Sequence, residues 1–364
     1  MAARRALASI ISVAALASLT GCSGAPSQGD AVGVAASTLT RNDVTFDVKV
    51  RGTGTVSIHA SVFVNDKASG LIDVLAVHGL AETGYTFAPL AQAIFADRVA
   101  GRRVRRIVAI DLPGHGDSGF PTGLPTGVHF GDLKIEDNVD VLLQVIDGLA
   151  AKRLYPRIII GHSMGGLEVQ AAQQTLLSRG SSFAAHGITG AILLAPVPPH
   201  GRPWSPAVGD STPFIVNDPT LGSYLSLPPA AFVAQALSTP AGQIVSDAPT
   251  PDEVTANHYS GPEPLTTLLQ LVESPIPTGE TTTTTIPRPT VNNGALSVFT
   301  GTLTTIASFS EDVLVPPADL ADLYTYLTFD RRALLYRAVT ADDAVHATYI
   351  SNPDLVVEAL RPML

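Results

Sequence analysis

The chain of 364 residues has a single cysteine, so no disulfide bond can form within it. Charged residues make up only 15% of the chain, and acidic residues outnumber basic ones by 32 to 22, which leaves a formal net charge of −10. This balance argues against nucleic acid as a partner and against electrostatic adsorption to anionic lipid. Apolar residues make up 45%, which suits a large buried core.

The N-terminus lacks an apolar run long enough to span a membrane, because residues 6–19 are too few. They follow Arg4 and Arg5 and lead into a small-residue stretch that ends at Cys22. This pattern resembles a bacterial lipoprotein signal, in which residues 1–21 are removed and a diacylglycerol is attached to the sulfur of Cys22. An ordinary secretory signal is the alternative, and the paired arginines leave twin-arginine export open. We expect an exported protein anchored to the membrane of the bacterial cell envelope through lipid on Cys22.

Removing residues 1–21 takes away two arginines and no acid, so the net charge becomes −12.

Residues 22–43 are rich in alanine, glycine, serine and threonine, which predicts a flexible tether. From residue 44 to 197, apolar strand-like runs alternate with helical segments, which predicts a mostly parallel, doubly wound α/β sheet. Residues 198–295 break this alternation and predict an inserted, mainly helical cap, with helices at 230–237 and 263–272. The alternation resumes over residues 296–364, the second part of the core.

One stretch within residues 44–197 has the sequence pattern of a catalytic nucleophile. A β-branched run at residues 157–160 leads into Gly161-His162-Ser163-Met164-Gly165-Gly166 and then into a helical segment at 167–177. A serine between two glycines on a strand-to-helix turn is the pattern of a nucleophile elbow. The glycines are needed because a Cβ two residues before or after the serine would hold the strand and the helix apart. We therefore expect Ser163 to be a nucleophile.

A serine nucleophile needs a histidine base and a carboxylate that orients the base. His346 follows a predicted core strand near the C-terminus, and we expect it to be the base. Asp312 lies just past another strand end and is the preferred acid, with its neighbour Glu311 as the alternative. Asp342 and Asp343 share the loop of His346, where they more naturally cap or solvate it.

The order Ser163, Asp312, His346 and the sequence Gly-His-Ser-Met-Gly-Gly resemble the α/β-hydrolase superfamily, in its capped branch of esterases and lipases. The resemblance implies an α/β-hydrolase fold and an oxyanion hole made by the backbone N–H groups of Leu80 and Met164. The stretch from 111 to 118 matches a turn of that family and is interpreted as structural. A serine nucleophile argues against haloalkane dehalogenase and epoxide hydrolase chemistry, in which a carboxylate attacks.

These features predict a cell-envelope serine hydrolase that cleaves carboxylic esters, with a small-molecule ester or a lipid as substrate. An acyltransferase would use the same three residues, and a non-catalytic lipid-anchored binding protein on a hydrolase scaffold is a further alternative. The sequence contains no metal cluster of recognisable spacing and no dinucleotide fingerprint, so we expect neither a metal nor a cofactor.

Overall fold

The computed structural model describes residues 39–79, 82–119, 121–127, 135–197, 302–312, 315–327, 334–341, 344, 346–361 and 363–364. All of them belong to one compact unit, Leu39–Leu364, which is distinct from residues 1–38. The predicted signal with Cys22, most of the tether and the predicted cap lie outside the described residues. Within those that are described, no helix is both long and apolar enough to cross a bilayer.

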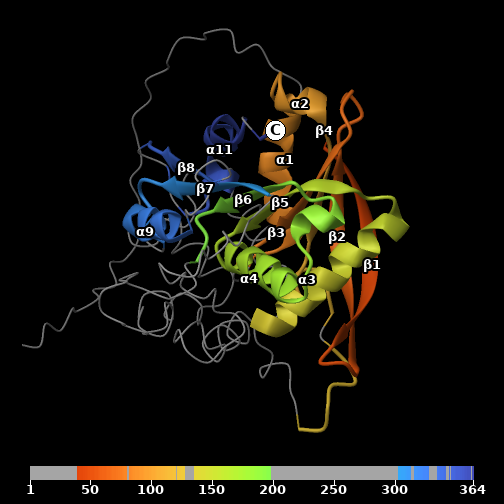
Figure 1. Cartoon of the computed structure of the whole chain (residues 1–364). Helices are drawn as coiled ribbons and strands as arrows, with labels where there is room; N and C mark the ends of the chain where they lie inside the picture. Colours follow the sequence, from red (N-terminus) through yellow and green to blue (C-terminus); the bar gives the residue numbers. More distant parts are fainter. Residues whose placement is uncertain are drawn as a thin grey trace, which may run out of the picture. The chain divides into compact units, whose positions relative to one another are not determined.

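Eight strands of the described part form one sheet, in the order β1-β2-β4-β3-β5-β6-β7-β8 (Figure 1). β1 (Thr40–Val50) pairs antiparallel with β2 (Gly54–Val64), and β2 pairs antiparallel with β4 (Val104–Ile110). All other neighbours are parallel, and they comprise β3 (Ile72–Val77), β5 (Pro156–His162), β6 (Gly190–Leu194), β7 (Leu303–Phe309) and β8 (Leu334–Val339). The mostly parallel, doubly wound sheet predicted from the sequence is confirmed.

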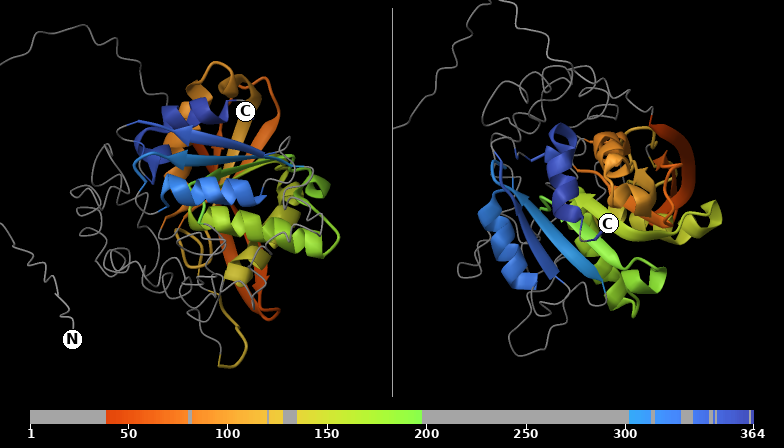
Figure 2. Two further views of the ribbon diagram at one scale, coloured as in Figure 1. Left: turned by 60° about the vertical axis from the view of Figure 1, so that its left-hand side comes forward. Right: turned by 90° about the horizontal axis from the view of Figure 1, so that it is seen from above.

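Helices cover both faces of the sheet (Figure 2). One face carries α3 (Ile135–Leu149), α4 (Met164–Ser178) and α9 (Pro317–Leu327). The other carries α1 (Ala88–Ala96) and α11 (Pro353–Leu360), with the short helices α2 (Ala100–Arg103) and α10 (Thr348–Ser351) packed beside them. Single 3₁₀ turns occur at Gly84–Phe87 (η1), Ala150–Lys152 (η3) and Phe183–His186 (η4).

The start of the first strand and the position of the long insertion can be compared with the sequence prediction. β1 begins at Thr40, so residues 40–43, which were predicted to belong to the tether, form part of a strand, and they are exposed. They lie on the edge strand of the sheet and bury no side chain, so they show no apolar alternation in the sequence. β7 lies directly beside β6 although residues 195–302 separate them in the chain. The long stretch without alternation is thus inserted between two adjacent parallel strands.

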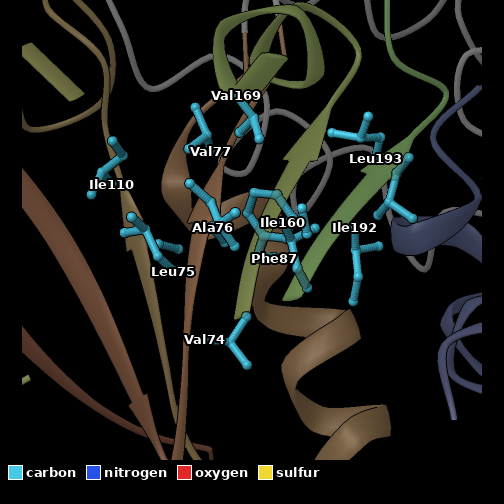
Figure 3. Packing of buried hydrophobic residues seen from close by; sticks show 14 of the residues in the cluster. Val74, Leu75, Ala76, Val77, Phe87, Ile110, Ile160, Val169, Ile192 and Leu193 are labelled. Atoms are coloured by element: carbon cyan, nitrogen blue, oxygen red, sulfur yellow. The ribbon is translucent and has the colours of Figure 1, made fainter. Parts of the chain in front are cut away.

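The core consists of the short apolar runs that the sequence predicted as strands buried on both faces. In β3, residues 74–77 are fully buried, and residues 158–162 of β5 and all of β6 are buried too. Figure 3 shows Val74 to Val77 packed between Ile110 on one side and Ile160 and Ile192 on the other, with Phe87 among them. Helices on both faces exclude water, so the strands show no polar alternation.

A carboxylic acid lies inside this core, on the helix that follows the serine. Glu168 on α4 is fully buried, and its Oε1 accepts a hydrogen bond of 3.0 Å from Asn138 Nδ2. Its Oε2 has no hydrogen-bond partner among the described residues. Burial raises the pKa of Glu168 to about 8, and the hydrogen bond from Asn138 offsets only part of this. Glu168 is therefore protonated at pH 7.

Glu168→Gln is expected to raise the free energy of unfolding by about 3 kcal/mol at pH 7. The unfolded carboxyl ionises near pH 4.5, whereas the folded one keeps its proton up to about pH 8, so wild-type stability falls as the pH rises through this window. Glutamine is neutral in both states, so its advantage should disappear toward pH 4. Urea unfolding between pH 4 and 9 measures the difference, with Glu358→Gln, at an exposed position of α11, as the control. Equal stability of wild type and Glu168→Gln at all pH values would contradict the prediction.

Candidate active site

Ser163 lies on a sharp turn between β5 and α4, in a backbone conformation that non-glycine residues rarely adopt, with φ 50° and ψ −116°. A Cβ added to Gly165 would lie 2.4 Å from the carbonyl oxygen of Val77, and one added to Gly161 would lie 2.5 Å from the carbonyl oxygen of Gly165. Both positions therefore exclude any larger residue. The turn is held by hydrogen bonds of 2.9 Å from the Ser163 N–H to the Leu194 carbonyl and 3.0 Å from the Val197 N–H to the Ser163 carbonyl.

Asp312 and His346 are brought together from the loops that follow β7 and β8. His346 Nδ1 lies 2.9 Å from Asp312 Oδ2, and both side chains are buried. Asp312 Oδ1 accepts a hydrogen bond of 2.8 Å from the Val315 N–H, which fixes the carboxylate. The alternative acid, Glu311, is exposed, and its N–H donates to the Ala344 carbonyl. Asp342 and Asp343 lie outside the described residues.

The environment of His346 favours its charged form. Burial lowers its pKa, but the charge of Asp312, the hydrogen bond to that carboxylate and the charge of Glu82 together outweigh burial, so the pKa is raised above 6.5. A base with a raised pKa holds a proton more strongly, which is the property needed to accept one from a serine hydroxyl.

The serine and the Asp312–His346 pair belong to one cluster at the carboxyl ends of the strands. The His346 ring centroid lies 4.7 Å from that of His162, the residue directly before Ser163. A Cβ added to Gly79, which follows β3, would lie 3.0 Å from Ser163 Cβ. Met164 is the first residue of α4, so its N–H has no carbonyl partner within the helix. Leu80, the other expected oxyanion donor, lies outside the described residues.

The structure adds a second acid–histidine pair that the sequence analysis did not identify. His162 is fully buried, with Nδ1 2.9 Å from Glu82 Oε2 and Nε2 3.0 Å from the carbonyl oxygen of His346. That carbonyl can only accept, so Nε2 of His162 carries a hydrogen. Glu82 Oε2 also accepts a hydrogen bond of 2.6 Å from the Gly79 N–H. Glu82 thus connects the loop after β3, the elbow and, through His162, the backbone of His346.

The sequence held only a faint signal for this pair. Glu82 lies three residues after Gly79, and His162 was visible as part of the elbow, but 80 positions separate them. Their contact exists because β3 and β5 are neighbouring parallel strands, whose carboxyl ends meet at one edge of the sheet.

Glu82→Gln is expected to lower kcat/KM by about 10- to 100-fold, because a small misplacement of His346 is enough for such a loss. It should also move the acidic limb of the pH profile to lower pH, because the negative charge of Glu82 raises the pKa of His346. The measurement is kcat/KM against pH on a soluble ester. Asp140→Asn, which removes an exposed carboxylate that pairs with Arg179, is the control. A uniform loss with an unchanged midpoint would show that Glu82 only supports the fold.

The turn from 111 to 118 has the structural role expected of it. Asp111 Oδ1 accepts from the Gly84 N–H at 2.6 Å, and Oδ2 accepts from the Asp117 N–H at 2.9 Å and lies 2.8 Å from His59 Nδ1.

His59, Asp111 and Asp117 are close enough together to hold a cation. However, the hydrogen bond to Asp111 outweighs burial and raises the pKa of His59, and its Nε2 lies 3.2 Å from Asp43. This cluster is therefore suited to hold a proton on His59.

Comparison with known proteins identifies the family. A sequence model of the Alpha/beta hydrolase family matches residues 74–359, which is most of the chain. The chain therefore belongs to the alpha/beta hydrolase family, and it is a hydrolase. No curated protein matches the sequence.

Solved structures share the fold at low sequence identity. A thermophilic esterase from Thermogutta terrifontis is 17% identical, with a TM-score of 0.53 over 88% of this chain and 97% of that one. The Cif epoxide hydrolase from Acinetobacter nosocomialis is 16% identical, with a TM-score of 0.55 over 88% and 89%. A thioesterase domain from the curacin biosynthetic pathway is 16% identical, with a TM-score of 0.50 over 88% and 99%. At these identities the likeness shows the fold alone.

Proposed function

We propose that this hydrolase cleaves carboxylic esters through an acyl-enzyme formed on Ser163. The observation that carries the proposal is a serine in a strained elbow, in one cluster with a buried Asp312–His346 pair. A carboxylate nucleophile, which epoxide opening and dehalogenation require, would have to occupy the elbow position, and this chain has serine there. Esters suit a serine nucleophile because the alkoxide leaving group needs only one proton from the histidine.

In the proposed reaction, His346 takes the hydroxyl proton of Ser163 as its oxygen attacks the ester carbonyl carbon. Asp312 holds His346 Nδ1–H and stabilises the imidazolium that forms. The N–H groups of Met164 and Leu80 stabilise the negative oxygen of the tetrahedral intermediate, each contributing about 3 kcal/mol. His346 then protonates the departing alcohol, activates a water molecule and returns the proton to Ser163 when the acid is released.

A fluorophosphonate probe tests the proposal, because it phosphonylates a serine only where a base activates the hydroxyl. The chain from Ser23 onward keeps every described residue and is used for labelling, followed by mass spectrometry of the adduct. We expect one adduct, on Ser163, and its loss in His346→Ala. Ser178→Ala, which changes an exposed serine on the same helix, should label fully. Absence of label on folded wild-type protein, together with no turnover of short- or long-chain esters, would overturn the proposal.

We also propose that the mature protein begins at Cys22 and is anchored to the bacterial cell membrane by lipid on its sulfur. The support is the leader pattern of residues 4–22. Mass spectrometry of the mature N-terminus tests this, since an unmodified cysteine or a cleavage site elsewhere would contradict it.

A further inference from the structure

The edge of the sheet opposite Ser163 combines positive charge with exposed apolar side chains. Ser163 follows the carboxyl end of β5, so the amino ends of the parallel strands β3, β4 and β5 form the opposite edge. The register there pairs Asp73 with Arg106 on one side and with Pro156 on the other. We call this region the basic edge, and it consists of Leu71, Arg102, Arg103, Arg105, Arg106, Arg153 and Tyr155.

A surface pocket of about 580 Å³ lies within the basic edge. It is lined by Leu71, Arg105, Arg106, Arg153 and Tyr155. Leu71 is 70% exposed and Tyr155 is 57% exposed, which makes them the two most exposed large apolar side chains of the described part. Exposed leucine and tyrosine beside arginines are the combination that a lipid–water interface accommodates, because the apolar groups enter the interface while the guanidinium groups bind phosphates.

Basic side chains outnumber acidic ones at this edge, where the turn after β2 adds one charge of each sign, Asp66 and Lys67. Asp73 is fully buried and forms ion pairs with both Arg105 and Arg106. Its single negative charge neutralises only one of these two positive charges. Arg102, Arg103 and Arg153 are exposed, and none of them pairs with a carboxylate among the described residues. The net charge of −10 belongs to the whole chain, whereas the basic edge is locally positive. A flat surface that contacts only this edge would therefore meet positive charge.

The chain also enters the fold at the basic edge. Thr40, the first residue of β1, pairs with Val64 of β2, and Val64 pairs with Arg106 of β4. Neighbouring strands lie about 4.8 Å apart, so Thr40 is about 10 Å from Arg106. Under the proposed anchoring at Cys22, the tether joins the domain at this edge. The attachment of the tether here matters only if the proposed location holds, whereas the charge and exposure of the basic edge do not depend on that location.

We propose that the basic edge is a docking surface for an anionic phospholipid bilayer. The arginines bind lipid phosphates, and Leu71 and Tyr155 enter the interface. Docking in this way turns the edge that carries Ser163 away from the membrane.

Binding to vesicles tests the proposal with the chain from Ser23, which has no lipid of its own. The probes are vesicles of phosphatidylcholine alone and vesicles with about one third phosphatidylglycerol, used in co-sedimentation at low salt. We expect binding to the anionic vesicles only, with release when the salt concentration rises to about 0.5 M, where screening is strong. Absence of binding to anionic vesicles would overturn the proposal.

Two matched charge variants locate the surface. Arg102→Gln with Arg153→Gln should weaken partitioning by roughly 25-fold, since each basic residue near an anionic surface contributes about fivefold. Lys49→Gln with Arg179→Gln removes the same charge from exposed positions elsewhere and should have little effect. Equal losses in the two variants would overturn the proposal, because binding would then follow net charge alone. Arg105 and Arg106 are left unchanged, because they neutralise buried Asp73.

A third variant tests the apolar part. Leu71→Ser with Tyr155→Ser keeps all charges, and it should weaken binding at least tenfold, because both side chains lose apolar area in the interface. An unchanged affinity for anionic vesicles would show that Leu71 and Tyr155 do not enter the lipid–water interface. All variants should hydrolyse a soluble ester at the wild-type rate, because Ser163 lies at the other edge. Failure of the proposed ester chemistry would leave the vesicle measurements unaffected, so the two proposals are separable.

Discussion

Ser163→Ala is expected to lower kcat for hydrolysis of a soluble ester by about 10⁶-fold, because removal of a serine nucleophile eliminates the covalent route entirely. Residual turnover should come from the oxyanion donors and from substrate binding. The substitution should leave the fold intact, since alanine and serine are similarly strained at φ 50°. Steady-state kinetics on an ester series, with thermal unfolding of the same samples, measure both effects.

Ser178→Ala is the matched control, because this exposed serine lies on the same helix and its hydroxyl donates to the Thr175 carbonyl. It should retain the wild-type kcat. Turnover by Ser163→Ala within tenfold of wild type would contradict the proposed mechanism and leave the elbow serine without a chemical role. A parallel loss of thermal stability would instead mean that the strained turn had been disturbed.

Asp312→Asn is expected to lower kcat by about 10⁴-fold, because the amide favours the wrong tautomer of the histidine and cannot stabilise the imidazolium. It should also change the pH dependence. Burial lowers the pKa of His346, and the charge and hydrogen bond of Asp312 together with the charge of Glu82 outweigh this. Without the carboxylate, burial dominates and the pKa falls. The neutral, active form of His346 then persists to lower pH, so the acidic limb of kcat/KM moves downward.

The control for this prediction is Glu311→Gln, which changes the adjacent, exposed carboxylate. Its pH profile and kcat should match those of the wild type. A large loss in Glu311→Gln with an active Asp312→Asn would show that the acid had been assigned to the wrong neighbour. A loss in Asp312→Asn without movement of the acidic limb would mean that His346 is not the group that titrates.

The largest differences between sequence and structure concern contacts that cross many positions. The alternation of apolar runs and helices predicted the sheet, and the elbow pattern predicted the strained turn at Ser163, because both depend on residues close together in the chain. The sequence favoured Asp312 over its neighbour Glu311 as the acid, from position alone. The structure distinguishes them because the loop after β7 turns one side chain toward His346 and the other toward solvent.

Glu82 and His162 could not be paired from the sequence, since their contact depends on the order β3-β5 in the sheet. The basic edge could not be predicted from the sequence for a related reason. Composition averages charge over the whole molecule, and the acidic total argued against adsorption to anionic lipid.

The sequence by itself determined the elements: which runs become strands, where the nucleophile turn lies, and which residue types could complete it. Those features follow from local periodicity and backbone strain. Only the tertiary structure decided which distant carboxylates meet which histidines, and on which edge the arginines gather. Such contacts depend on strand order and register, which bring residues dozens of positions apart within hydrogen-bond distance and leave no local pattern in the chain.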